Sequence, residues 1–487
     1  MSILDATDPS ISSTGEDAAA IADLHRAFEV QQRAFAADRS PGLDERRARV
    51  EKVIVMMLTY RPRIAEALAA DFGAHPAPAS DLLEVLGVVG RAQYVMANLE
   101  AWMAAETREA DPATLGTARV SIQNQPKGVI GNMVPWNFPF DIGVGPLTEM
   151  LAAGNRVIIK PSEVAPASAA LLAEMVAATF DPSLVHVAVG GLDLARAFAA
   201  LRWDHLMYTG SPNVGRQIMA AAAPNLTPVT LELGGKCPAV LTPGSVTAAN
   251  VESVLGTKII KNGQMCVSVD YCLVPRADIP TFVGLAKAFM ASNAPAYSRG
   301  PDCTGIISQR HLDRLTSMLD EARDRQTEIV TLEQDGAVDP ATRRMPMVLA
   351  IDPAADLRIM QDEIFGPILP VVPYDDLGQA IDGINAGERP LGLYVFGEDD
   401  AAVARVLDNT HSGGAAVNTC AIQAALPSLG FGGVGMSGMG RHHGIEGFRE
   451  FSNPRGLVIR GQTGDLIETF YAPYAKAAAL VEAALGG

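Results

Sequence analysis

The residues best suited to chemistry in this 487-residue chain are Cys266 and Glu232. Cys266 lies in the run 262–267 (Asn-Gly-Gln-Met-Cys-Val), and Glu232 lies in the run 231–236 (Leu-Glu-Leu-Gly-Gly-Lys). A free thiol is mostly protonated at neutral pH, so a nucleophilic cysteine needs a base or a positive field. A carboxylate is such a base, and glycines beside both residues let main chain approach a substrate closely. For Cys266 taken alone, a buried structural cysteine is the alternative.

Asn137 is the third candidate catalytic residue. It lies in the run 135–139 (Pro-Trp-Asn-Phe-Pro), where two prolines restrict the backbone. Its side-chain amide can donate to the oxyanion that forms when a thiolate attacks a carbonyl carbon, a contact worth about 3 to 4 kcal/mol in comparable sites. The backbone amide of Cys266 would be the second donor. The alternative is an asparagine that caps a turn.

The run 210–215 (Gly-Ser-Pro-Asn-Val-Gly) is a candidate phosphate-binding turn. It follows an expected strand and opens an expected helix, which puts backbone amides near a helix N-terminus where a pyrophosphate can bind. Taken alone the pattern is weak, because it is not the Gly-x-Gly-x-x-Gly fingerprint.

Composition indicates a compact α/β enzyme and excludes several other classes. A chain of 487 residues exceeds one ordinary core, so we expect two large domains. The net charge of -17 argues against nucleic-acid binding. No apolar run approaches the roughly 18 to 20 residues that span a bilayer, so no membrane contact is expected. The apolar stretch 475–485 is too short, and we expect a helix packed on the body or on another subunit.

The composition of residues 1–16 and the pattern of cysteines favour a cytoplasmic location. Residues 1–16 are polar and acidic, which is not typical of a secretory signal. Five cysteines without C-x-x-C spacing fit reduced thiols better than disulfides or a zinc site. His442 and His443 lack a third ligand at metal spacing, so we interpret them as a solvated or helix-capping pair and expect no metal.

Short β-rich runs alternate with helical runs from residue 128 onward, which predicts a mostly parallel, doubly wound sheet. The expected strands are 128–134, 156–159, 185–189, 205–208 and 229–233, and the expected helices are 165–179, 192–200 and 213–222. A second βα series from residue 238, with a helix at 247–261, predicts another α/β domain that carries the thiol. An apolar stripe of helical period predicts a long helix over 44–71.

Six motifs in this order resemble those of the aldehyde dehydrogenase superfamily along nearly the whole chain. They are the runs 135–139, 160–163 (Lys-Pro-Ser-Glu), 210–215, 231–236, 262–267 and 363–367 (Glu-Ile-Phe-Gly-Pro). Within this superfamily, the sequence most resembles the class 3-like branch that includes the coniferyl aldehyde dehydrogenases. The resemblance to this branch rests on the run 226–232, the pair Asp270-Tyr271 and the glycine-rich run 430–440.

The resemblance implies a fold and its domain limits. It implies a Rossmann-like NAD-binding domain, a second α/β catalytic domain and a small β extension for oligomerisation. The expected limits are 1–118 with 127–233 for the first domain, 234–425 for the second, 119–126 with 451–470 for the oligomerisation strands, 426–450 for a late loop and helix that return to the NAD-binding domain, and 471–487 for a helical tail.

The cofactor implied is NAD, with NADP possible. Lys160 and Glu163 resemble the pair that binds the adenosine ribose, where a carboxylate repels a 2'-phosphate. Glu363 resembles the residue that holds the nicotinamide ribose, and Phe365 the residue beside the ring. The other cofactor-binding residues that the resemblance implies are Pro135, Trp136, Ser162, Gly210, Ser211, Gly215 and Leu233.

The activity implied is NAD(P)-dependent oxidation of an aldehyde, aromatic (coniferaldehyde-like) or medium-chain, to a carboxylic acid through a cysteine thiohemiacetal and thioester. One alternative is a CoA-acylating aldehyde dehydrogenase, although such relatives generally lack the glutamate base. A non-catalytic NAD-binding homologue is another, although it is expected to lose the candidate catalytic residues. Segments 119–125 and 454–461 resemble strands that bridge subunits, which implies a homodimer or homotetramer.

Two departures from the family pattern lie beside the thiol. Lys261 stands where relatives usually carry asparagine, and Ser268-Val269 replaces a common Ala-Pro. A lysine near Cys266 would favour the thiolate. Because lysines seldom stay buried, we favour instead a solvated Lys261 that points away from the site.

Overall fold

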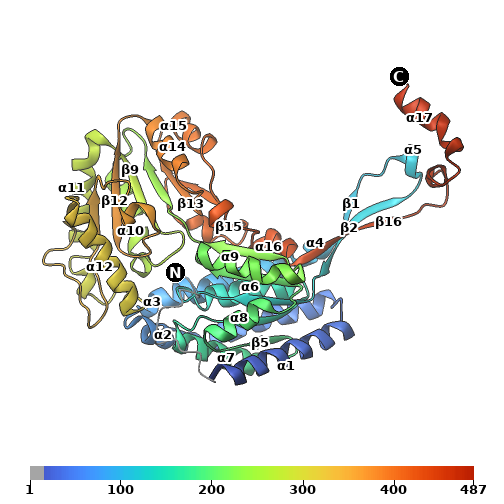
Figure 1. Cartoon of the computed structure of the whole chain (residues 1–487), viewed down its shortest axis with the longest axis horizontal. Coiled ribbons are helices and arrows are strands. Elements are labelled where there is room, and N and C mark those ends of the chain that lie inside the picture. The colour runs from blue at the N-terminus through green and yellow to red at the C-terminus, as the bar shows by residue number, and fades with distance from the viewer. Residues whose placement is uncertain (1–15, 487) are drawn as a thin grey trace.

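The computed structural model describes residues 16–486, so the expectation for residues 1–15 lies outside the described part of the chain. Within 16–486 the chain forms a six-stranded, a seven-stranded and a three-stranded sheet (Figure 1). Two α/β bodies hold the two larger sheets, and the third sheet forms an arm. In this range no helix is both long and apolar enough to span a bilayer.

The six-stranded sheet has the order β15-β7-β6-β3-β4-β5. Its strands are β3 (Val129–Met133), β4 (Arg156–Lys160), β5 (Val185–Val187), β6 (His205–Gly210), β7 (Val229–Leu233) and β15 (Gly438–Met439). The helices between them are α6 (Asp141–Ala152), α7 (Pro166–Thr179), α8 (Leu192–Ala200) and α9 (Pro212–Ala222). The chain before them forms α1 (Glu16–Ala37), α2 (Leu43–Phe72), α3 (Ala77–Ser80), the π-helix η1 (Asp81–Leu86) and α4 (Gly87–Met103).

Strands β3 to β7 are parallel to their neighbours, as the βα alternation predicts, and only β15 runs antiparallel. Successive side chains of β4 enter different cores: Val157 and Ile159 pack in one, and Ile158 packs in the other. Helices therefore cover both faces of the sheet, which explains why its strands are apolar throughout.

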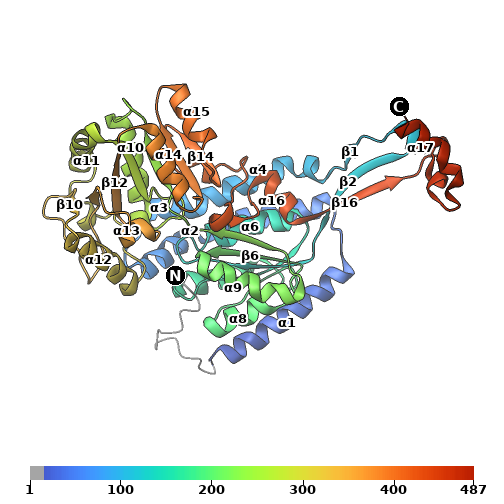
Figure 2. The same ribbon diagram turned by 45° about the horizontal axis from the view of Figure 1, so that its top comes forward.

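The seven-stranded sheet has the order β10-β11-β12-β9-β8-β13-β14 and is parallel except for the β10–β11 pair. Its strands are β8 (Pro238–Leu241), β9 (Tyr271–Pro275), β10 (Glu328–Thr331), β11 (Val348–Ile351), β12 (Ile368–Tyr374), β13 (Gly392–Phe396) and β14 (Gly414–Val417). The helices of this body are α10 (Ala248–Ile259), α11 (Ile279–Asn293), α12 (Gln309–Asp324), α13 (Arg358–Gln361), α14 (Leu377–Ala386) and α15 (Asp400–Asp408) (Figure 2).

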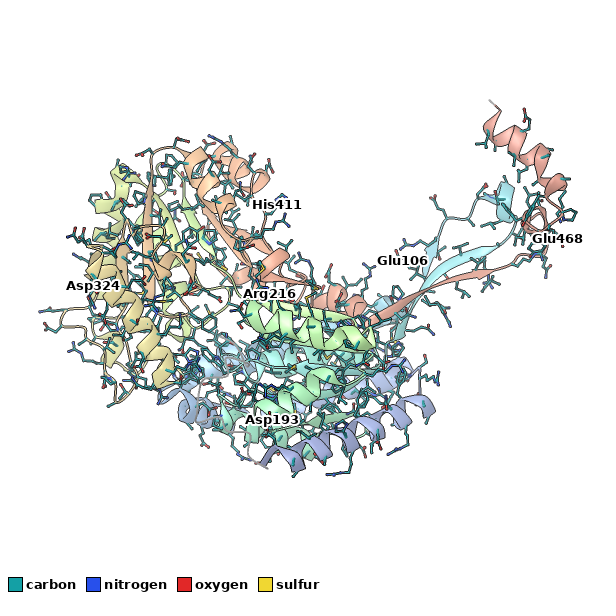
Figure 3. The ribbon with its side chains drawn as sticks, in the orientation of Figure 1. Glu106, Asp193, Arg216, Asp324, His411 and Glu468 are labelled. Atoms are coloured by element: carbon teal, nitrogen blue, oxygen red, sulfur yellow. The ribbon has the colours of Figure 1, made fainter. Side chains whose placement is uncertain are left out.

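The third sheet is an arm that projects from the first body (Figure 1). It consists of β1 (Glu106–Arg108), β2 (Arg119–Pro126) and β16 (Ser452–Ile459), with the short helix α5 (Pro112–Leu115) between β1 and β2 and the helix α16 (Gly444–Glu450) before β16. Strand β2 lies in the centre, paired antiparallel with both neighbours. Side chains crowd both bodies but are sparse along the arm, where Glu106 and Glu468 are labelled (Figure 3).

The helix α17 (Ala478–Leu485) lies at the far end of this arm (Figure 1). None of its residues is buried. The expectation that this apolar tail packs on the body is therefore wrong, because the arm carries it away from both cores. Packing on another subunit stays a prediction.

Candidate active site

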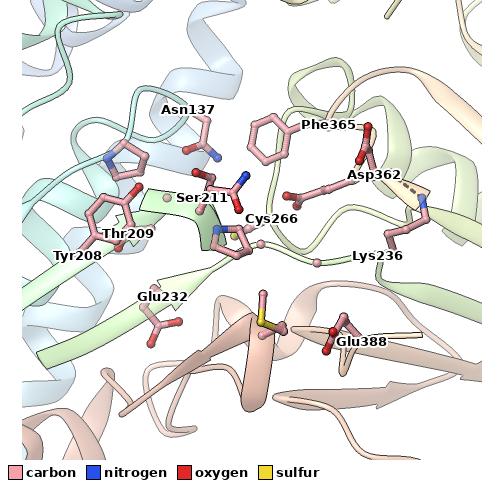
Figure 4. A pocket seen from close by; sticks show the side chains of 18 of the residues that line it. Asn137, Tyr208, Thr209, Ser211, Glu232, Lys236, Cys266, Asp362, Phe365 and Glu388 are labelled. Carbon is pink, nitrogen blue, oxygen red and sulfur yellow. Dashed lines mark hydrogen bonds between the residues drawn. The ribbon is translucent and has the colours of Figure 1, made fainter. Parts of the chain in front are cut away.

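A cavity of about 1750 Å³ lies between the two bodies, where the carboxyl ends of β3, β4, β6 and β7 meet loops of the second body. Figure 4 shows some of the side chains that line it, among them Asn137, Glu232 and Cys266. This is where a doubly wound sheet binds its ligands. The cavity brings together most of the residues predicted from sequence: Pro135, Trp136, Asn137, Lys160, Ser162, Glu163, Gly210, Ser211, Glu232, Cys266, Glu363 and Phe365. Gly215 and Leu233 do not line it.

Cys266 follows a tight backbone segment at the end of α10. Lys261, Asn262 and Gly263 all adopt left-handed conformations, with φ of 47°, 54° and 78°. A Cβ on Gly263 would lie 2.3 Å from the carbonyl oxygen of Gly366, so only glycine fits there. This close approach joins the thiol loop to the loop that carries Glu363.

The side chains around Cys266 disfavour its thiolate form. Burial, followed by the negative charges of Glu363 and Glu232, raises the pKa of the thiol to about 12. The amides of Cys266 and Val267 act in the opposite direction. Because a free cysteine titrates near 8.5, this thiol needs a base to ionise at neutral pH.

Glu232 lies near the end of β7 and is 2% exposed, with neither carboxylate oxygen hydrogen bonded within the described chain. Burial raises its pKa well above the usual range, which makes it a stronger base once it is ionised. Strand β15 pairs beside it, with Gly438 opposite Glu232. A Cβ on Gly438 would lie 2.1 Å from the carbonyl oxygen of Leu231, so the glycine-rich run 430–440 packs directly against the candidate base.

His442 and His443 lie behind Glu232 rather than in solvent. They are 2% and 8% exposed, and their rings stack with centroids 4.5 Å apart. Both contact Arg91, which also forms a buried ion pair with Glu149. The interpretation of a solvated or helix-capping pair is wrong, because Arg91 supplies a buried partner and neither side chain caps α16. Within 16–486 no group of three or more His, Cys, Asp or Glu could hold a metal ion.

Asn137 is 4% exposed and its Nδ2 donates to the carbonyl oxygen of Gln264 at 3.2 Å. Gln264 is two residues before Cys266, so this contact holds the side-chain amide close to the thiol loop. Lys261 in turn donates to the backbone oxygen of Asn137 at 2.6 Å and forms an ion pair with Glu84. The predicted solvated Lys261 is wrong: both side chains of this pair are fully buried, because each neutralises the other.

The opposite end of the cavity has the features of a dinucleotide site. Helix α9 begins after Ser211, whose hydroxyl accepts from the amide of Val214. A Cβ on Gly210 would lie 2.1 Å from the phenol oxygen of Tyr208, so glycine keeps this turn open. Gly215 lets α9 pack against Leu233, whose side chain would lie 3.0 Å from a Cβ there. Gly215 and Leu233 therefore support the turn without lining the cavity.

Lys160 and Glu163 form an ion pair of 2.6 Å on the cavity wall. Glu363 is half-buried, and its buried Oε1 lacks a hydrogen-bond partner within 16–486. Burial raises the pKa of Glu363 to about 7. A Cβ on Gly234 would lie 2.1 Å from Glu363 Oε2, so this carboxylate occupies the space that glycine leaves. The Phe365 ring packs edge-on to Trp136, with centroids 5.3 Å apart.

These residues fit a nicotinamide dinucleotide. The helix N-terminus offers amides to an anionic phosphate, the carboxylates of Glu163 and Glu363 offer acceptors to sugar hydroxyls, and the unpartnered oxygen of Glu363 leaves one acceptor to be satisfied. Cys266 and Glu232 line the same cavity. The fold and the site thus define an NAD(P)-dependent oxidoreductase.

Comparison with known proteins identifies the family. The profile of the aldehyde dehydrogenase family matches residues 5–456. Probable coniferyl aldehyde dehydrogenases from Caulobacter vibrioides and Pseudomonas aeruginosa are 40% and 39% identical, over 89% and 94% of this chain and 92% and 94% of theirs. The substrate-bound structure of Staphylococcus aureus AldH is 31% identical with a TM-score of 0.88, over 94% of this chain and 99% of that one.

The chain belongs to the aldehyde dehydrogenase family, and it is an NAD(P)-dependent enzyme that acts on small-molecule aldehydes. A Mycobacterium tuberculosis aldehyde dehydrogenase solved with NAD+ is 26% identical with a TM-score of 0.80, over 91% of both chains. The sequence predictions of family, fold class, activity and cofactor are thereby confirmed.

Three residues beside the site had no signal in the sequence. Glu84 lies in a π-helix and looks like one of many surface carboxylates. Arg91 and Glu149 lie on α4 and α6, outside every motif, and the side chains of their pair are 3% and 0% exposed. The only hints were Lys261, which departs from the family pattern, and the double histidine at 442–443.

Proposed function

We propose that Cys266 is the nucleophile, Glu232 the general base and Asn137 the oxyanion donor of this aldehyde dehydrogenase. The single observation that carries the proposal is that one cavity is lined by all three. The sulfur of Cys266 bonds to the aldehyde carbon, and the carbonyl oxygen becomes an oxyanion that accepts from Asn137 Nδ2 and the Cys266 amide. Glu232 takes the thiol proton, which the raised pKa of Cys266 makes necessary.

Oxidation turns the thiohemiacetal into a thioester. The nicotinamide cofactor supplies the acceptor for the hydrogen and electron pair that leave the aldehyde carbon. Glu232 releases the thiol proton to solvent and then removes a proton from water, while the oxygen of that water bonds to the thioester carbon. The carbon–sulfur bond breaks, the carboxylic acid leaves and Cys266 is restored. A buried carboxylate with a raised pKa suits this role, because it holds a proton more firmly than an exposed one.

We propose that Glu163 and Lys160 bind the adenosine ribose, Glu363 the nicotinamide ribose, and the amides at 210–215 the pyrophosphate. Phe365 and Trp136 then bound the nicotinamide pocket. Because Glu163 carries a negative charge on the cavity wall, NAD is preferred over NADP.

The substrate class that we propose is an aromatic aldehyde of the coniferaldehyde type, with medium-chain aldehydes as the second class. The support is the name of the relatives with 40% and 39% identity. Measuring kcat/KM over a panel of cinnamaldehydes, benzaldehydes and linear aldehydes tests it, and a preference for short linear aldehydes would contradict it.

We further propose a homodimer or homotetramer in the cytoplasm, joined through the arm, and the domain limits given from the resemblance. Val458 and Ile459 on β16 are 56% and 43% exposed, and the outer edge of β16 has no partner strand within the described chain. An exposed apolar strand edge needs a cover in a soluble protein.

The experiment on the mechanism separates the thiol from the base. Cys266→Ala is expected to abolish oxidation and retain NAD binding. Glu232→Gln is expected to slow thiol deprotonation and, more strongly, thioester hydrolysis, so that a slower burst of reduced cofactor precedes a still slower steady state. Wild-type turnover in either variant would reject the role of that residue. Formation of acyl-CoA with added CoA would favour the CoA-acylating alternative, which the family comparisons do not favour.

A further inference from the structure

Lys261 forms a buried cationic link that the catalytic scheme does not use. Its Nζ donates to Glu84 and to the backbone oxygen of Asn137, and lies 3.9 Å from the centre of the Phe138 ring. The other oxygen of Glu84 accepts from the amides of Phe140 and Asp141, at 3.1 Å and 2.8 Å. Glu84 and Lys261 therefore hold the turn that carries Asn137 from two sides.

The same link reaches the thiol loop through a closed circuit of hydrogen bonds. Asn137 Nδ2 donates to the Gln264 carbonyl at 3.2 Å, Gln264 Nε2 donates to the Lys261 carbonyl at 2.9 Å, and Lys261 Nζ donates back to the Asn137 carbonyl at 2.6 Å. Each of the three residues thus fixes the next. A displacement of the ammonium would release the Asn137 turn from the loop that ends in Cys266.

Two observations indicate that a lysine at this position acts through its ammonium rather than through its backbone. The φ of 47° is unfavourable for lysine and is better tolerated by asparagine. A buried ion pair is also a poor source of stability, because removing two charges from water offsets most of their attraction. The charge nevertheless lies against the backbone of the candidate oxyanion donor.

We propose that Lys261 and Glu84 are positioning residues that set the side-chain amide of Asn137 against the reacting carbonyl of the aldehyde. This inference rests on the proposed role of Asn137. The pair holds the oxyanion donor in place before substrate arrives, so that no reorganisation is needed in the transition state. Neither residue contacts the substrate.

A double-mutant cycle with Asn137→Ala tests the proposal. Lys261→Asn suits the left-handed backbone but cannot reach Glu84, so it removes the ammonium alone. It is expected to lower kcat/KM for the aldehyde about 10- to 100-fold, the scale of a small misplacement of a catalytic group. In the Asn137→Ala background the same change is expected to cost less than about twofold, because the group it positions is absent. Equal losses in both backgrounds would overturn the proposal.

Three further measurements keep the outcome decisive. The Kd for NAD is expected to be unchanged in Lys261→Asn, and a loss of NAD binding equal to the loss of kcat/KM would count against positioning.

Arg46→Met is the control variant. It removes another buried cation, one that donates to the carbonyls of Pro41 and Ala152, and is expected to lower the melting temperature without the coupling to Asn137. Glu84→Gln, run through the same cycle, replaces Lys261→Asn if that variant does not fold. Full activity of Asn137→Ala would instead reject the proposed function of Asn137, and the positioning role with it.

Discussion

Nε2 of His442 lies 4.0 Å from Oε1 of Glu232, while Nδ1 of the same ring lies 3.0 Å from Arg91. An arginine only donates, so Nδ1 accepts, and the neutral ring carries its proton on Nε2, on the side of Glu232. Burial and the positive charge of Arg91 lower the pKa of His442 well below its usual range, which keeps the ring neutral. Glu149 fixes Arg91 with two hydrogen bonds of 2.6 Å and 2.7 Å.

Removal of this N–H is expected to lower the fraction of Glu232 that is ionised and so able to act as a base. In His442→Phe the carboxylate loses a polar hydrogen that favours its charged form, so its pKa rises further. The fraction of Glu232 that is ionised at neutral pH then falls, and kcat at neutral pH is expected to fall in proportion. The acid limb of the kcat–pH profile, measured by stopped-flow and steady-state absorbance, is expected to move to higher pH.

His443→Phe is the matched control for that experiment. Nε2 of His443 accepts from Arg91 at 3.1 Å, and no ion-pair contact joins His443 to Glu232 within 16–486. Its acid limb is therefore expected to stay at the wild-type position. An equal shift in both variants would show that packing around Arg91, and not the Nε2 proton of His442, sets the strength of the base.

The activity of the wild-type enzyme is expected to rise with pH from neutrality into the alkaline range. Both Cys266 and Glu232 act in their deprotonated forms, and burial raises the pKa of each. A raised pKa moves ionisation to higher pH, so kcat/KM is lost as pH falls. Glu232→Gln is expected to remove one of the two ionisations from the profile, and an optimum below neutrality would contradict the assignment.

Cofactor choice is expected to depend on the charge of Glu163. NAD should give the higher kcat/KM, and Glu163→Gln should narrow the gap to NADP by relieving repulsion of a 2'-phosphate. Lys160, which Glu163 binds at 2.6 Å, would then be free to attract that phosphate. Kinetics with both cofactors at a saturating aldehyde concentration measure the ratio. Equal or better use of NADP by the unmodified enzyme would place Glu163 away from the ribose.

The arm is expected to join subunits. Light scattering should report about twice the 51.2 kDa chain mass or more, because paired edges are the commonest answer to an exposed apolar strand. Val458→Pro, which removes a strand donor, should weaken the assembly, whereas Val458→Thr keeps the donor and should leave it intact. A monomer would reject association, and a dimer unchanged by the proline would reject its location.

The sequence by itself determined the residue types that do chemistry and the elements that carry them. The apolar runs of β3 to β7 alternate with helical runs, and that local pattern alone predicted a doubly wound sheet, because both faces of each strand are covered. Cys266, Glu232 and Asn137 were candidates because each lies in a short run that contains glycine or proline, and the resemblance of six motifs to one family then implied their roles. The expected ranges of the strands and helices differ from those in the structure by a few residues at most. For example, the strand expected at 128–134 is Val129–Met133.

Only the tertiary structure decided what surrounds these residues. Lys261 was expected in solvent, and it is buried because its partner Glu84 comes from a helix 177 positions away. His442 was expected in solvent or at a helix cap, and it is buried because Arg91, 351 positions away, supplies a partner. The protonation of a buried group depends on which charges the fold brings within a few ångströms of it. No local pattern encodes that information, so the strength of the base and the placement of the oxyanion donor follow from the packing of the whole chain.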